Sequence, residues 1–117
     1  MTHTLLLLVL ALAACSKEAE PPPAPGQQLV PETELKRGRD ACAAYVAQVC
    51  LCAETMPGLV EQCRLARALP PALEVQQDIG TAPGVENKDA VSLAVGLRKT
   101  IKTCIDETAK LPTVGCR

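Results

Sequence analysis

The sequence predicts an all-α fold, a small three-helix bundle held together by disulfide bonds. Apolar residues recur at helical spacing in three segments from about Glu34 onward. Proline and glycine interrupt the pattern between these segments, and none of them alternates as a half-buried strand does. The chain has one Tyr and neither Phe nor Trp, so its core consists of small aliphatic side chains and needs cross-links.

The first predicted helix begins near Glu34 and ends at the turn Met56-Pro57-Gly58. The residue before a proline avoids helical geometry, and Pro-Gly is typical of a turn. One face of this helix is apolar, and Tyr45 flanks it as a core residue. The members of the stripe are Cys42, Val46, Val49, Ala53 and Met56.

The second predicted segment runs from Leu59 to about Gly80. Pro70-Pro71 interrupts it, which either kinks the helix or starts a new one with proline in its first turn. Its apolar face consists of Leu59, Cys63, Ala66, Leu69 and Leu73.

The third predicted helix follows a Gly/Pro loop at residues 81–86, with Asn87 as its N-cap. Leu111-Pro112 ends it, and a short tail continues to Cys116. Its predicted apolar face consists of Ala90, Leu93, Ala94, Leu97, Ile101, Cys104, Ile105 and Thr108.

The N-terminus carries a short apolar segment, residues 5–14, that is too short to span a bilayer and fits the hydrophobic region of a secretory signal. It ends in Leu12-Ala13-Ala14-Cys15. This motif resembles the lipobox of bacterial lipoproteins. The resemblance implies removal of residues 1–14, a diacylglyceryl group on the Cys15 sulfur and, commonly, acylation such as palmitate on the new amine. Ser16 in place of Asp implies sorting to the outer membrane.

The next residues form a linker. Residues 15–33 are rich in proline and poor in apolar side chains, so they predict a disordered tether between the lipid and a domain at residues 34–117. Several acyl chains on one residue make the membrane attachment effectively permanent.

Six cysteines remain in the mature chain, an even number that predicts three disulfides in an oxidising compartment. They are Cys42, Cys50, Cys52, Cys63, Cys104 and Cys116. Cys50 and Cys52 are about 200° apart around a helix, so one can face the second helix and the other the third. Of the fifteen pairings we favour Cys50–Cys63, Cys52–Cys104 and Cys42–Cys116.

The sequence offers little equipment for catalysis or for metal binding. His3, the one histidine, is removed with the signal, so no histidine base remains. Cys50 and Cys52 lack the second short-spaced pair that is usual at zinc sites. Asp106 and Glu107 diverge on their helix. We therefore expect no enzyme activity, no cofactor, no metal and no small-molecule substrate.

Charge is balanced, with 12 basic and 13 acidic residues, and one aromatic cannot form a stacking platform, so no nucleic-acid partner is expected. Arg98, Lys99 and Lys102 cluster on the third helix. This cluster is interpreted as ordinary surface, the alternative being a patch that docks an anionic partner.

The sequence leads to the hypothesis of an envelope-anchored lipoprotein that acts as a non-catalytic interaction or structural module, with the membrane and an envelope protein as partners. The alternative is a periplasmic thiol–disulfide redox protein that uses Cys50 and Cys52. A secreted inhibitor or toxin-like module is a third hypothesis.

Overall fold

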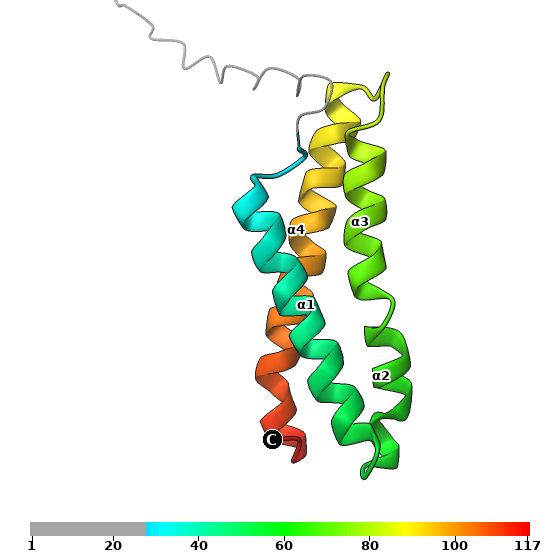
Figure 1. Ribbon diagram of the computed structural model, residues 1–117, viewed down its shortest axis with the longest axis vertical. Helices are drawn as coiled ribbons and strands as arrows, with labels where there is room; N and C mark the ends of the chain where they lie inside the picture. Colours follow the sequence, from blue (N-terminus) through cyan, green and yellow to red (C-terminus); the bar gives the residue numbers. More distant parts are fainter. Residues whose placement is uncertain (1–27) are drawn as a thin grey trace, which may run out of the picture.

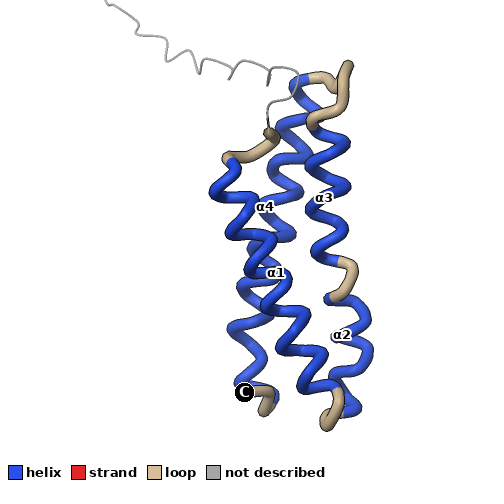
Figure 2. The backbone as a smooth tube through the Cα atoms, in the orientation of Figure 1, coloured by secondary structure: helices blue, strands red, loops and turns tan. Residues whose placement is uncertain are grey.

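The structure is a computed structural model that describes residues 28–117. The predicted signal at 1–14, Cys15 and most of the predicted linker lie outside the described residues. Within residues 28–117 every regular element is a helix (Figure 2). The all-α prediction is confirmed for this part of the chain.

Three successive legs form the bundle, each antiparallel to the one before it in the chain (Figure 1). Helix α1 (Glu32–Ala53) is the first leg, α2 (Val60–Ala66) and α3 (Leu69–Gly80) together make the second, and α4 (Asn87–Lys110) is the third. The second leg runs opposite to α1, so α1 and α4 run in the same direction. Helix α4 packs against both α1 and α3, and α2 packs against α1.

The folded part begins earlier than the predicted boundary at residue 34. Helix α1 starts at Glu32, and Val30 is only 2% exposed. Leu29 covers Gly80 at the end of α3, where a Cβ atom would lie 2.7 Å from the leucine methyls. The last residues of the predicted linker therefore belong to the domain.

Proline places the breaks where the sequence predicts them. Met56 is extended (φ −123°, ψ 89°) and is followed by the 3-10 helix η1 (Pro57–Leu59), so α1 cannot continue through the turn. Pro70-Pro71 lies in the first turn of α3, where a missing N–H costs nothing. The alternative of a new helix at these prolines is confirmed.

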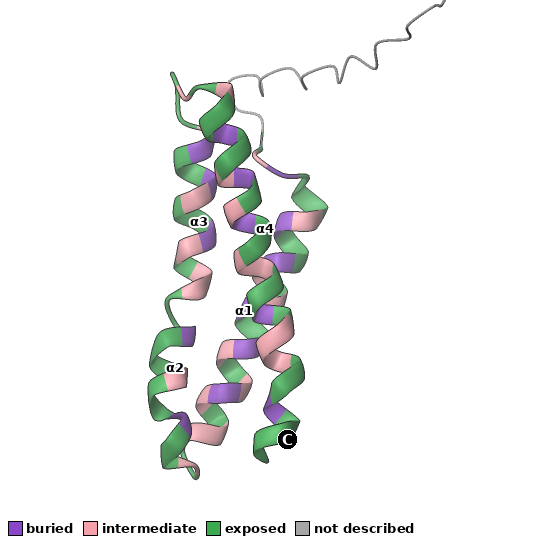
Figure 3. Cartoon of the chain, turned by 180° about the vertical axis from the view of Figure 1, so that it is seen from behind, coloured by how far each residue is buried: buried purple, intermediate pink, exposed green. Residues whose placement is uncertain are grey.

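Most of the predicted apolar faces point inward, and burial follows one side of each helix (Figure 3). Two expectations are wrong. Ile105 is 53% exposed because it lies on the edge of the α4 stripe. Asn87 is the first residue of α4 rather than its cap; Glu86 occupies that position, and no side chain caps the helix. Leu35 and Leu111, both 1% exposed, are core residues that lie outside the predicted apolar faces.

Helices α1 and α4 approach closely at Gly38. A Cβ atom there would lie 2.4 Å from Ile101 Cδ1 and 2.5 Å from its Cγ1. Both contacts are well inside van der Waals distance, and a β-branched side chain such as Ile101 has few alternative rotamers in a helix. Gly38 therefore sets the spacing between the two helices.

We predict that Gly38→Val lowers the free energy of unfolding by about 2 kcal/mol or more, because overpacking displaces Ile101 or separates α1 from α4. Gly58→Val is the matched control, since nothing lies within 4 Å of a Cβ there. Urea unfolding followed by circular dichroism measures both. Equal destabilisation of the two variants would contradict the assigned role of Gly38.

Candidate functional site

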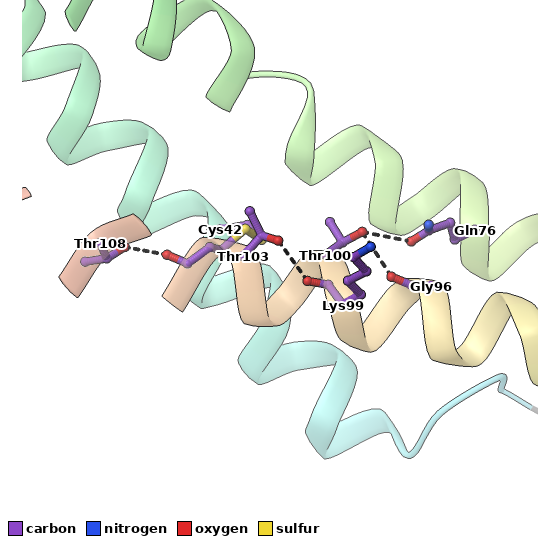
Figure 4. Close-up of a disulfide and its surroundings, with 8 residues drawn as sticks. Cys42, Gln76, Gly96, Lys99, Thr100, Thr103 and Thr108 are labelled. Carbon is purple, nitrogen blue, oxygen red and sulfur yellow. Dashed lines mark hydrogen bonds between the residues drawn. A yellow bond between two sulfur atoms is a disulfide. The ribbon is translucent and has the colours of Figure 1, made fainter. Parts of the chain in front are cut away.

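The central disulfide joins α1 to α4. Cys42 and Cys104 have Cα atoms 4.9 Å apart, and both residues are 0% exposed. The bond lies where the two parallel helices face each other (Figure 4). It links residues 62 positions apart in sequence, so it removes a large part of the unfolded chain's conformational freedom, about 4 kcal/mol in the chain-entropy treatment.

The second disulfide, Cys50–Cys63, closes the hairpin between α1 and α2. Its Cα atoms are 4.7 Å apart, and the bond spans 13 residues. The turn at Met56 and η1 reverses the chain between the two cysteines. This pairing was predicted from the sequence and is confirmed.

The third disulfide, Cys52–Cys116, ties the C-terminal tail to α1, with Cα atoms 5.7 Å apart. The tail leaves α4 through the 3-10 helix η2 (Leu111–Val114), which begins with Pro112 in its first turn. Gly115 then adopts φ +89°, a left-handed conformation that glycine accepts without strain. This turn brings the Cys116 sulfur 3.7 Å from the carbonyl oxygen of Gln48 on α1.

The predicted pairs Cys52–Cys104 and Cys42–Cys116 are wrong. They require the tail to return two turns along the bundle, whereas η2 keeps it beside the end of α4. Because α1 and α4 run in the same direction, Cys42 of α1 meets Cys104 of α4. Cys52, which lies later on α1, meets Cys116 in the tail that follows α4. The two observed bonds accordingly span nearly equal sequence separations, 62 and 64 residues. Cys50 does face the second leg as expected, but Cys52 faces the tail after α4.

The six cysteines differ in solvent access. Cys42, Cys104 and Cys116 are 0% exposed, and Cys63 is 8% exposed. Cys50 and Cys52 are partly exposed. Cys50 and Cys52 are therefore the two most exposed of the six cysteines. Each is bonded to a more deeply buried one, Cys50 to Cys63 and Cys52 to Cys116.

Threonine hydroxyls along α4 are used within the bundle. Thr103 donates to the Lys99 carbonyl (3.0 Å) and Thr108 to the Cys104 carbonyl (2.7 Å), one turn earlier in each case (Figure 4). Thr100 lies 3.4 Å from Gln76 Oε1 of α3 and 3.2 Å from the Gly96 carbonyl. Of these contacts the one to Gln76 joins α4 to α3, and the others return to carbonyls of α4 itself, as threonine hydroxyls commonly do inside a helix.

Two interhelical ion pairs lie toward the N-terminal half of α1. The Arg98 guanidinium donates to both oxygens of Glu34 at 2.7 and 3.2 Å, joining α4 to α1. Arg39 donates to both oxygens of Glu74 at 2.6 and 2.8 Å, joining α1 to α3. Bidentate geometry of this kind is the strongest arrangement for an exposed pair.

Hydrogen bonding lowers the pKa of both carboxyl groups. The guanidinium of Arg98 holds the pKa of Glu34 below its usual value of 4.5, and its hydrogen bond contributes most. Arg39 lowers the pKa of Glu74 in the same way. Arg98 lies 64 residues from Glu34 along the chain, so the local sequence does not reveal this partner.

The predicted basic cluster is partly neutralised within the chain. Arg98 pairs with Glu34, and Lys102 pairs with Asp106 one turn later. In the described part of the chain Lys99 is the member of the cluster without an ion pair. The arrangement favours the interpretation as ordinary surface.

The neighbouring carboxylates Asp106 and Glu107 point to different partners. Lys102 binds Asp106, whereas Lys110 donates to Glu107 at 2.6 Å. Gln62 of α2 lies between the legs, donating to the hydroxyl of Tyr45 at 2.9 Å and lying 3.5 Å from Glu107. Tyr45 is 3% exposed, so its prediction as a core residue is confirmed.

Residues 28–117 contain no group of three or more His, Cys, Asp or Glu side chains placed to hold a metal ion. No helix in that range has the length and apolar character required to cross a membrane. Comparison with protein families, with curated proteins and with solved structures finds no match to the chain.

We predict that stability falls as pH falls, in part through Glu34 and Glu74. Their pKa values are lower in the folded than in the unfolded chain, so their contribution is complete above pH 4.5 and is lost as pH falls through the folded-state values. Glu34→Gln with Glu74→Gln should flatten the acid limb of the pH–stability curve measured by urea unfolding. Glu54→Gln, at an exposed position without an ion pair among the described residues, is the control. Equal flattening by this substitution and by the double substitution would show that the two ion pairs are not the source of the effect.

Proposed function

We propose that the protein is a lipid-anchored component of a bacterial envelope that acts as a non-catalytic interaction module. The observation that carries the proposal is the division of its seven cysteines. Six pair with one another inside the described domain. Cys15, the last residue of the Leu12-Ala13-Ala14-Cys15 motif, is left over, and the lipobox resemblance gives its sulfur a role as a thioether to diacylglycerol.

The chain that would be displayed on this anchor is small and heavily cross-linked. Three disulfides in the described domain suit an oxidising compartment, because the reducing cytoplasm does not preserve such bonds. Because Ser16 rather than Asp follows Cys15, we propose the outer membrane as the location. The tether from Cys15 into the domain holds the bundle near the bilayer without requiring its surface to touch lipid.

The surface supports a role in binding another protein. Within residues 28–117, nine large aliphatic side chains are more than half exposed. Four of them lie within three residues of a cysteine of the Cys50–Cys63 or Cys52–Cys116 bond: Leu51, Val60, Leu65 and Val114. Exposed apolar groups held on a rigid frame are typical of interaction surfaces, since little conformational entropy is lost on binding.

The alternative, a thiol–disulfide redox protein, would require Cys50 and Cys52 to cycle between thiol and disulfide. In the structure each is bonded to a different and distant cysteine. A catalytic cycle at these positions would break both Cys50–Cys63 and Cys52–Cys116 in every turnover. We therefore rank structural disulfides above this alternative.

We predict that Cys15→Ser abolishes incorporation of labelled palmitate and moves the protein from the membrane fraction to the soluble fraction. Loss of the acyl chains removes the hydrophobic anchor, and residue 15 lies outside the described bundle. Ser16→Asp is the matched control: it should keep the label but shift the protein from outer to inner membrane. Native mass spectrometry showing residues 1–14 still attached and Cys15 unmodified would refute the anchor.

We predict no free thiol in the protein purified from the periplasmic side and denatured without reductant, because all six domain cysteines are paired. Maleimide labelling followed by mass spectrometry gives the count. A reproducible fraction with both Cys50 and Cys52 reduced would favour the redox alternative instead.

A further inference from the structure

The cross-links divide the bundle into two parts. The ion pairs Glu34–Arg98 and Arg39–Glu74 lie in the part nearer the start of α1. Cys42–Cys104 lies next along α1, and Cys50–Cys63 and Cys52–Cys116 lie at its end. We call the segments 50–66 and 111–117 the distal part, and the remainder of the described bundle the proximal part.

The distal part consists of short elements that cannot persist alone. Helix α2 has 7 residues, η1 has 3 and η2 has 4. Isolated helices shorter than about 12 residues are marginal in water. The proximal part, by contrast, is built on α4 with 24 residues and on most of α1 with 22. Covalent bonds therefore matter more to the distal part than to the proximal part.

The solvent exposure of the cysteine residues follows the same division. Thiol–disulfide exchange requires a thiolate to approach one sulfur of the bond. Both cysteines of the proximal bond are 0% exposed, so neither end of Cys42–Cys104 can be approached without opening the α1–α4 interface. Cys50 and Cys52 are partly exposed residues, so each distal bond has one cysteine near the surface.

We infer that the distal part is a reducible unit: a dithiol reductant opens Cys50–Cys63 and Cys52–Cys116, releasing residues 50–66 and 111–117, while the proximal part stays folded around Cys42–Cys104. The inference concerns the response of the fold to reductant and does not depend on the lipid anchor or on a partner.

The chemical step is ordinary exchange. A thiolate of the dithiol attacks Cys52 Sγ, and Cys116 leaves as a thiolate that takes a proton from water. The second thiolate of the reagent then attacks the reagent sulfur that is bonded to Cys52. This closes the reagent's disulfide and expels the Cys52 thiolate, which is protonated in turn. The protein gains two electrons and two protons, and the dithiol becomes a disulfide. The same step at Cys50 releases Cys63.

Release of the tail uncovers apolar surface. Cys116 is 0% exposed and its sulfur lies against the Gln48 carbonyl, while a Cβ at Gly115 would lie 3.8 Å from Met56 Cε. On the other side of α1, the Cys50–Cys63 bond holds Leu59, 7% exposed, and Ala66, 2% exposed, in the core. Reduction would therefore expose the buried side chains Leu59 and Ala66 and the surface of α1 that the tail covers.

The test treats the native full-length protein with dithiothreitol, quenches samples with excess maleimide, and maps labelled cysteines by mass spectrometry. We expect Cys50, Cys52, Cys63 and Cys116 to be labelled at least about tenfold faster than Cys42 and Cys104, because accessibility limits the exchange rate. Simultaneous labelling of all six, or earlier labelling of Cys42, would overturn the inference.

Hydrogen exchange on the partly reduced protein supplies the second measurement. Amides of residues 50–66 and 111–117 should lose protection, and amides within α3 and residues 87–100 of α4 should keep it. Cys52→Ser with Cys116→Ser is the matched variant: without reductant it should lose protection at 111–117 alone, with 50–66 unchanged. If the distal bonds are reduced and protection there does not change, the bonds do not hold this part closed and the inference fails.

Discussion

The bond between Cys42 and Cys104 is the constraint around which the bundle is organised. It fixes two parallel helices, α1 and α4, at one register in the middle of their contact, and both cysteines are fully buried. The close approach at Gly38 depends on the same register, since Ile101 lies one turn before Cys104. Once α1 and α4 are aligned, α2 packs against α1, α3 packs against α4, and the tail after α4 lies beside the end of α1.

The small core explains why covalent links are so numerous. Among the largest fully buried side chains there are leucines, valines and cysteines but no aromatic residue. A domain of this size with such side chains buries limited apolar surface, so its hydrophobic stabilisation is modest. The disulfides compensate by restricting the unfolded chain. Because α1 and α4 are already joined by Cys42–Cys104, the parallel bond Cys52–Cys116 closes a much shorter additional loop and serves chiefly to hold the tail.

The ion pairs that join different helices and two of the disulfides lie at opposite ends of α1. The two bidentate ion pairs between helices, Glu34–Arg98 and Arg39–Glu74, join the three legs near the start of α1, whereas two of the three disulfides lie at its end. Low pH therefore weakens contacts between helices of the proximal part through Glu34 and Glu74, whereas a reductant acts on the distal part through Cys50 and Cys52. The exposed apolar side chains of the proposed interaction surface, Leu51, Val60, Leu65 and Val114, lie in the distal part, so their arrangement depends on the redox state of its disulfides.

The sequence alone determined the helical class, the breaks at Pro57 and Pro70-Pro71, most of the inward faces and the Cys50–Cys63 bond, because periodicity, proline stereochemistry and a hairpin are local properties. Only the tertiary structure decided the other two pairings, the Glu34–Arg98 and Arg39–Glu74 contacts and the exposure of Ile105. These depend on how far α4 slides along α1 and on the path of the tail through η2. Helical periodicity fixes which face of a helix turns inward, but it leaves the axial register of two helices open until their side chains pack.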